Sequence, residues 1–99
     1  MGVKIIGVEE LLKTAKKDNR ARKPLLRWIA DASAADWKSP SDVKAAYASA
    51  SFLADNRVVF NIGGNNFRLI VVAVYEDGAL VVRFFGTHAE YDEIDANTV

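Results

Sequence analysis

The sequence predicts a two-layer α+β fold, in which N-terminal helices pack on an antiparallel sheet and a short helix lies near the C-terminus. Helical periods of apolar residues occupy the first half of the chain. The second half carries β-branched and aromatic runs separated by glycine-containing turns. A chain of 99 residues supports one core. Helices followed by strands therefore predict a single α+β domain over residues 1–99.

The predicted sheet has three consecutive strands, which are Arg57–Ile62, Phe67–Tyr75 and Ala79–Phe85. These runs contain the β-branched and aromatic residues that strands favour. Residues 63–66 read Gly-Gly-Asn-Asn, and both residue types tolerate the positive φ of a hairpin turn. Residues 76–78 predict a second turn. The middle strand is apolar at almost every position, so it should be central and buried on both faces.

Two antiparallel helices are predicted before the sheet, joined by a tight basic turn. The first is Glu9–Lys17, and its apolar stripe consists of Val8, Leu11, Leu12 and Ala15. The second runs from about Ala21 to Ala34 and buries Leu25, Trp28, Ile29 and Ala32. Pro24 should lie in its first turn, because an interior proline breaks a helix. The preceding segment, Val3–Ile6, is expected to add a short strand to the sheet edge.

The Ser-Pro-Ser-Asp run at residues 39–42 is a further helix start, with serine as the N-cap and proline at the first helical position. It predicts a brief helix near Val43–Tyr47. Residues 48–56 then form a connection to the sheet, which Phe52 and Leu53 should anchor to the core.

The composition excludes several functional classes. Without cysteine the chain can form neither disulfides nor thiolate zinc sites, and its one histidine excludes a histidine-rich metal site. No metal and no cofactor are expected. No apolar run approaches the roughly 20 residues of a membrane span, and the N-terminal residues lack the pattern of a signal peptide. A cytoplasmic protein without a membrane partner is therefore expected.

Charge is unevenly distributed, although the net charge is zero. A basic segment, opposed only by Asp18, contains Lys13, Lys16, Lys17, Arg20, Arg22, Lys23 and Arg27. Such asymmetry favours a polyanionic partner. The alternative is a solvated helix face with no ligand.

The only histidine, His88, lies where the last strand meets the C-terminal helix. Thr87 and Glu90 have the spacing of a capping box, with threonine as the N-cap. Tyr91 follows His88 by three residues, so both side chains should lie on one patch. The helix dipole favours a bound phosphate and disfavours imidazolium, which predicts a neutral His88 able to accept a proton. A surface histidine in a cap, with Tyr91 packed on the core edge, is the alternative.

Two arginines interrupt the apolar sheet. Strand alternation places Arg68 on one face with Ile70, Val72 and Val74, and Arg83 on one face with Val81 and Phe85. An arginine among such neighbours needs an anion or hydrogen-bond acceptors. A salt bridge to Glu90 or Asp92, or an exposed strand end, would satisfy it equally well.

Residues 59–65 read Val-Phe-Asn-Ile-Gly-Gly-Asn, followed by Phe-Arg-Leu-Ile at 67–70, Val-Arg at 82–83 and Thr-His-Ala-Glu-Tyr-Asp at 87–92. This pattern, with the two basic helices and the Ser-Pro-Ser-Asp start, closely resembles the HigB-type toxins of bacterial type II toxin–antitoxin systems, in the RelE-like group. The resemblance covers nearly the whole chain and implies the RelE/ParE-like toxin fold. It also implies an endoribonuclease that cuts messenger RNA, usually on the ribosome, and that a helix-turn-helix antitoxin neutralises.

The resemblance suggests a role for each candidate residue. Metal-free RNA cleavage uses the 2′-hydroxyl as nucleophile and needs a base, an acid and cations. His88 is the expected base, Arg68 and Arg83 stabilise the charged transition state, and Tyr91 orients a nucleobase or donates a proton. Asp92 is a weaker candidate base, and without a second histidine the acid is unassigned. The residues expected to contact RNA are Asn61, Asn65 and the basic segment, Lys13, Lys16, Lys17, Arg20, Arg22, Lys23 and Arg27.

Two other functions fit the same sequence. A related branch of the fold contains ParE-like gyrase inhibitors, which bind a protein and cleave nothing. A plain RNA- or DNA-binding module would use the basic helices and leave His88 incidental. A histidine and a tyrosine on a capped helix, beside two strand arginines, favour the nuclease.

Overall fold

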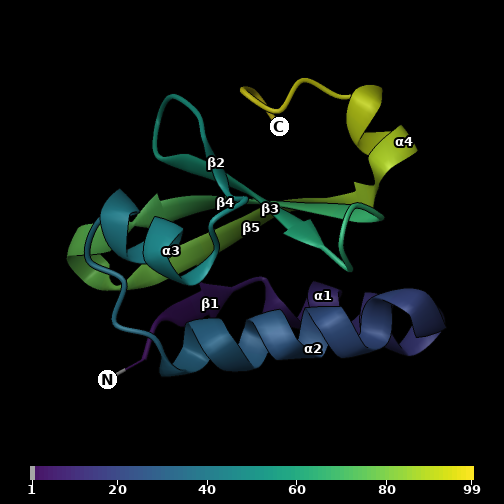
Figure 1. The fold of residues 1–99 in the computed structure, drawn as a ribbon, viewed down its shortest axis with the longest axis horizontal. Coiled ribbons are helices and arrows are strands. Elements are labelled where there is room, and N and C mark those ends of the chain that lie inside the picture. The colour runs from purple at the N-terminus through teal and green to yellow at the C-terminus, as the bar shows by residue number, and fades with distance from the viewer. Residues whose placement is uncertain (1) are drawn as a thin grey trace.

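A five-stranded sheet forms the centre of the computed structural model, which describes residues 2–99 (Figure 1). The elements in chain order are β1 (Lys4–Ile6), α1 (Val8–Lys17), α2 (Asn19–Ala34), α3 (Pro40–Ala46), β2 (Ser51–Phe52), β3 (Arg57–Ile62), β4 (Phe67–Val74), the 3₁₀ turn η1 (Tyr75–Asp77), β5 (Ala79–Thr87) and α4 (His88–Asp92). This order confirms the predicted α+β class. Within residues 2–99 no helix is long and apolar enough to cross a membrane.

The sheet is mixed, with strand order β1-β5-β4-β3-β2. Strands β2 to β5 pair antiparallel, as expected. The edge strand β1, however, runs parallel to β5, so an entirely antiparallel sheet was the wrong prediction. Because the helices and three other strands separate β1 from β5 in the chain, no hairpin fixes their relative direction. The central place predicted for β4 is confirmed, since it lies between β3 and β5.

Helices α1, α2 and α3 cover one face of the sheet, below it and at its left end in Figure 1. The core lies between these layers. Trp28 of α2 meets Phe60 of β3 edge-on, with ring centroids 5.3 Å apart, and Trp37 stacks on the same ring at 6.1 Å. Leu25 of α2 and Leu69 of β4 are completely buried in this cluster.

Helix α4 and the segment that follows it lie on the other side of the sheet (Figure 1). Val59 and Ile70, which are register partners, are buried without belonging to the helix-side core. Two guanidinium groups tie the last residues to this side, because Arg57 and Arg83 both donate to the main-chain oxygen of Val99, at 2.9 and 3.3 Å. The sheet is thus covered unevenly, by three helices on one face and a short segment on the other.

The start of α2 differs from the prediction. The helix begins at Asn19, because the Asp18 side chain accepts a hydrogen bond from the Arg20 amide and acts as the N-cap. Pro24 consequently lies in the second turn, beyond the first turn where it was expected. The cap at Ser39 and the first-position Pro40 of α3 are confirmed.

Two apolar side chains predicted to be buried are exposed. Leu12 of α1 is 39% exposed, because Leu11 and Ala15 alone turn toward the core. Phe52 is 38% exposed on β2, an edge strand within the predicted connection, and the ammonium of Lys44 lies 6.0 Å from its ring centroid. The prediction that Phe52 anchors this connection is therefore wrong.

Candidate functional site: a histidine, a tyrosine and a buried arginine

The capping box at the β5–α4 junction is confirmed. The Thr87 hydroxyl accepts from the Glu90 amide at 3.1 Å, and the Glu90 carboxylate accepts from the Thr87 amide at 2.8 Å. The His88 amide donates to the main-chain oxygen of Asn66 at 3.0 Å, so the β3–β4 turn also supports the start of α4. Hydrogen bonds within α4 and from the β3–β4 turn therefore fix the position of the backbone at His88.

These bonds occupy most of the amide donors that a phosphate could use at the start of α4. Of the first three amides of this five-residue helix, those of His88 and Glu90 are already donated to protein oxygens. Phosphate binding by the helix end, as expected from the sequence, is not supported. A phosphate would have to be bound by a side chain instead.

His88 is exposed and pairs with Asp92 one turn further along α4. Its Nδ1 lies 3.0 Å from the Asp92 carboxylate. Because a carboxylate can only accept, a neutral imidazole carries its hydrogen on Nδ1 and keeps the lone pair of Nε2 free. Asp92 therefore orients the imidazole, and in that neutral tautomer Nε2 is the ring nitrogen that carries no hydrogen. From the sequence alone, Asp92 was only the weaker candidate for the base.

Arg68 is the buried cation of this site, with 9% of its surface exposed. Its guanidinium donates to the side-chain oxygen of Asn65 at 2.7 Å, and to the main-chain oxygens of Asn65 and Phe67 at 3.2 and 3.1 Å. All three acceptors are neutral. No carboxylate within residues 2–99 forms an ion pair with it, so the salt bridge to Glu90 or Asp92 is wrong. The positive charge is held in place without being neutralised.

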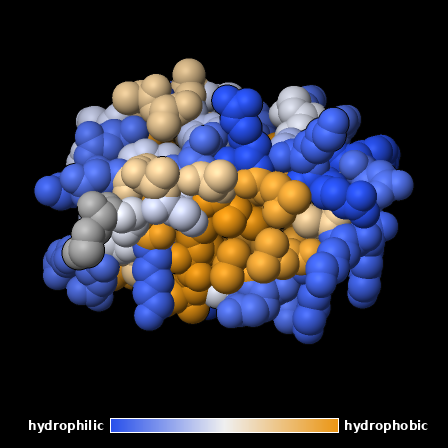
Figure 2. All heavy atoms as spheres, turned by 90° about the horizontal axis from the view of Figure 1, so that it is seen from below, coloured by the Kyte–Doolittle hydropathy of each residue, from blue (hydrophilic) through white to orange (hydrophobic). Residues whose placement is uncertain are grey.

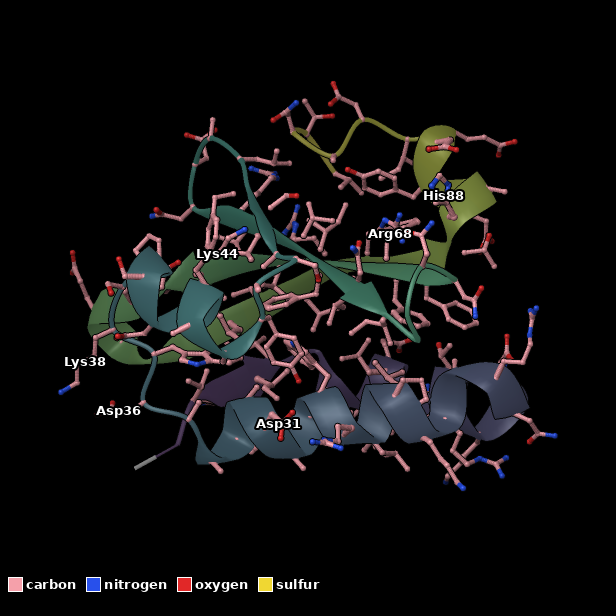
Figure 3. All side chains as sticks on the ribbon, in the orientation of Figure 1. Asp31, Asp36, Lys38, Lys44, Arg68 and His88 are labelled. Atoms are coloured by element: carbon pink, nitrogen blue, oxygen red, sulfur yellow. The ribbon has the colours of Figure 1, made fainter. Side chains whose placement is uncertain are left out.

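Tyr91 connects the arginine to the helix. The Arg68 guanidinium carbon lies 5.8 Å from the centroid of the Tyr91 ring, within the range of a cation–π contact. Tyr91 and His88 are one turn apart on α4, and the start of this helix is bonded to the β3–β4 turn that precedes Arg68. Figure 3 shows the labelled His88 and Arg68 at the same end of the molecule. Three of the four predicted catalytic side chains therefore lie together.

Arg83 makes different contacts. Val71 pairs with Val82 and Ile70 with Phe84, so Arg83 is the extra residue of a β-bulge. Beyond the bulge, Phe85 turns to the helix side and stacks on Phe67 at 5.5 Å, so the expectation that it shares a face with Arg83 and Val81 is wrong. The exposed Arg83 guanidinium binds the Val99 oxygen. A β-bulge leaves no clear signal in a single sequence.

The basic segment surrounds the α1–α2 turn. Three of its members have acidic partners on their own helices or at the turn, namely Lys13 with Glu10, Arg20 with Asp18 and Arg27 with Asp31. Arg22 donates to the main-chain oxygens of Ala15 and Lys16 and so caps α1. Lys16, Lys17 and Lys23 form no ion pair with any residue between positions 2 and 99.

The α1–α2 turn and the start of α4 lie at one end of the molecule (Figure 1). The Arg20 guanidinium carbon lies 5.6 Å from the centroid of the Phe67 ring, and Phe67 pairs with Thr87, the residue before His88. The two asparagines that were predicted to contact RNA lie in different places. Asn65 holds Arg68, whereas the half-buried Asn61 lines an open hollow of about 310 Å³ between α2, α3 and β3.

A family model described as the RelE-like toxic component of a toxin–antitoxin system matches residues 21–94, which include α4 and every strand except β1. By this match the chain is a RelE-like toxin. Within that class it belongs to the HigB toxin family.

Two relatives show how far the similarity reaches. The chain is 34% identical over 58 residues to the mRNA interferase toxin HigB of Escherichia coli K12, and the mRNA interferase HigB of Shigella flexneri matches to the same extent. The aligned segment covers 57% of this chain and 56% of each relative. The chain therefore spans about half the length of the curated relatives it matches.

Proposed function

We propose that this chain is an endoribonuclease that cleaves messenger RNA by attack of a 2′-hydroxyl on the neighbouring phosphate. In this proposal Nε2 of His88 removes the hydroxyl proton, and Arg68 stabilises the negative charge of the transition state. Tyr91 holds the guanidinium and either stacks on a base or protonates the leaving 5′-oxygen. The 2′-oxygen–phosphorus bond forms as the phosphorus–5′-oxygen bond breaks, which leaves a 2′,3′-cyclic phosphate.

The uncompensated charge of Arg68 is the observation that carries this proposal. A buried guanidinium is costly unless a counter-charge or several hydrogen bonds stabilise it. Here only neutral oxygens bind it, beside a histidine whose free ring nitrogen is set by a carboxylate. A phosphodiester supplies the missing negative charge. A protein that only binds a partner has no need of an oriented imidazole next to this cation, which favours cleavage over a ParE-like inhibitor.

The cellular setting is part of the same proposal. The names of the relatives support messenger RNA as the substrate, and the lysines around the α1–α2 turn supply a surface for RNA backbone or the ribosome. The toxin–antitoxin family supports a cognate antitoxin, which we take to be a helix-turn-helix protein. We place the activity in the cytoplasm, where messenger RNA is translated.

Replacing the proposed base tests the function directly. His88→Gln should abolish growth arrest in cells and lower RNA cleavage by about 100-fold or more, because a positioned general base contributes on that order. RNA ends with 2′,3′-cyclic phosphate should disappear with it. The matched control is Glu93→Gln, which changes an exposed side chain just past α4 and should leave cleavage unchanged.

The other outcomes separate the alternatives. If folded His88→Gln still arrests growth and the parent makes no cyclic phosphate ends, the protein acts by binding. Arrest accompanied by DNA gyrase inhibition would identify a ParE-like inhibitor. RNA binding without cleavage would identify a binding module. Circular dichroism of each variant checks that the fold is retained.

A further inference from the structure

The outer face of the helix pair carries an exposed apolar patch that the proposed chemistry does not use. Figure 2 shows it as a continuous orange area on the molecule seen from the helix side. Leu12 of α1 and Leu26 of α2, which is 42% exposed, are the most exposed large apolar side chains of these two helices. Val8 and Ile29 are partly exposed on the same two helices. We call these four residues the helical patch.

The geometry of the hairpin brings these residues together. The two helices are antiparallel about the turn at Asp18, and Leu12 and Leu26 stand at similar distances from it. Val8 and Ile29 lie one turn further from Asp18 along their helices, each on the same side as its neighbour. The buried residues Leu11 and Leu25 precede Leu12 and Leu26, so the core is already filled from the inner faces. Ile29 packs partly against the core, so Leu12 and Leu26 are the members that the fold leaves exposed. Contiguous exposed aliphatic surface marks an interaction site.

The rim of the patch is basic at the end nearest the α1–α2 turn, whereas the exposed Glu9 lies in the first turn of α1. Lys16 lies one turn beyond Leu12, and Lys23 lies one turn before Leu26. Neither lysine forms an ion pair with any residue of the described part of the chain. An apolar strip edged by free positive charges is complementary to an amphipathic segment that carries aliphatic and acidic side chains. RNA offers phosphates to the lysines but nothing aliphatic to the leucines.

We propose that the helical patch is the docking surface for an acidic, amphipathic segment of the cognate antitoxin. This inference rests on the neutralisation included in the proposed function. The patch lies on the helix layer, whereas His88 lies on α4, which is on the opposite side of the sheet (Figure 1). Neutralisation then does not require the antitoxin to cover His88. The bound segment instead covers Lys16 and Lys23 and removes them from the RNA-binding surface.

Polar substitutions in the patch test the proposal. Leu12→Ser and Leu26→Ser remove exposed apolar surface without touching the site, and Phe52→Ser is the matched control, an equally exposed side chain on β2. The probe is the protein encoded beside this chain in its own operon, coexpressed and tested for rescue of growth. Both patch variants should arrest growth like the parent, escape rescue, and lose co-purification with the probe by tenfold or more. Phe52→Ser should be rescued normally.

Lys16→Glu tests the charge of the rim. It should weaken rescue by an acidic partner, and added salt should weaken co-purification of the parent complex in the same direction. Hydrogen exchange of the parent complex gives a readout that needs no variant, since α1 and α2 should gain protection when the probe binds.

Four results would overturn the proposal. The first is normal rescue of both leucine variants, and the second is unchanged exchange in α1 and α2. The third is a patch-dependent dimer of the free chain in light scattering, which would assign the surface to a second copy. The fourth is loss of growth arrest by folded patch variants, which would assign the patch to the toxic activity itself. The proposed nuclease activity is tested separately, by the variant His88→Gln.

Discussion

At the scale of single residues, the site depends on how one cation is held. Arg68 is fixed by the turn that precedes its own strand, through Asn65 and the main chain, and on its other side by the Tyr91 ring. These partners position the guanidinium but leave its charge available. Adding a carboxylate next to it should then change activity more than stability.

Asn65→Asp makes that test with almost no change in shape. Aspartate retains the acceptor at 2.7 Å from Arg68 but neutralises the cation, so thermal stability should be kept or raised. Cleavage should fall by about tenfold or more, equal to about 1.4 kcal/mol of transition-state stabilisation. Asn66→Asp, one residue further along the exposed turn, is the control for added charge. Unchanged cleavage by Asn65→Asp would show that Arg68 does not bind the phosphate.

The contributions of the Tyr91 ring and of its hydroxyl can be measured separately. Tyr91→Phe keeps the ring over Arg68, and Tyr91→Ala removes both. If the hydroxyl protonates the leaving oxygen, the phenylalanine variant should lose cleavage almost as far as the alanine variant. If the ring only positions Arg68, the phenylalanine variant should remain near the parent in kcat. Single-turnover cleavage of a short RNA separates these results from effects on product release.

At the scale of elements, sequence patterns predicted helices and strands well where local chemistry decides them. The Thr87–Glu90 capping box and the Ser39 cap appear where the residues indicated. The features that were missed depend on distant contacts. The parallel pairing of β1 is set by β5, and the bulge at Arg83 is set by the register of β4. Neither partner can be read from the local residues.

Contacts between distant parts of the chain also limited what could be predicted about the site. The sequence predicted the proximity of His88 and Tyr91, because helical spacing fixes it. The pairing of His88 with Asp92 follows from the same spacing and would have been the natural reading for Asp92. The contact between Arg68 and Tyr91 joins two elements and needed the fold. The diversion of Arg83 to Val99 could not be foreseen, because it needs both the bulge and the course of the last residues.

Helix α2 offers a prediction on acid stability. The Arg20 amide that binds the Asp18 carboxylate lowers its pKa below the usual value of 3.8. A lowered pKa in the folded state stabilises the fold above the unfolded value, and this contribution is lost as the pH falls through the folded value. The melting temperature of the parent relative to Asp18→Asn should therefore decline below pH 3.8. Asparagine caps equally well but does not titrate. A constant difference across this range would exclude the cap as the source.

At the scale of the whole molecule, the two faces of the helix pair differ in what they contact. Its inner face fills the core through residues such as Leu25, and its outer face carries the helical patch. Of the two neighbouring leucines in α2, Leu25 should therefore contribute far more to folding than Leu26. This division allows the core and the patch to be altered independently.

Leu25 and Leu26 provide a matched pair for that division. Leu25→Ala should cost about 2–5 kcal/mol of unfolding free energy, because it opens a cavity at a fully buried position. For a chain of this size the melting temperature should fall by roughly 10 °C or more. Leu26→Ala removes a half-exposed side chain and should cost much less, about 0.5 kcal/mol. Equal losses in chemical denaturation would mean that the patch is part of the core.

Both tryptophans of the chain, Trp28 and Trp37, pack on the one ring of Phe60, on the helix side of the sheet. Their intrinsic fluorescence should be quenched or shifted to short wavelength in the native state and should change sharply when the core opens. RNA bound near α4 on the other side would leave that signal almost unaltered. The protein thus contains its own optical reporter of unfolding, and inactive variants can be screened for native emission without any attached dye.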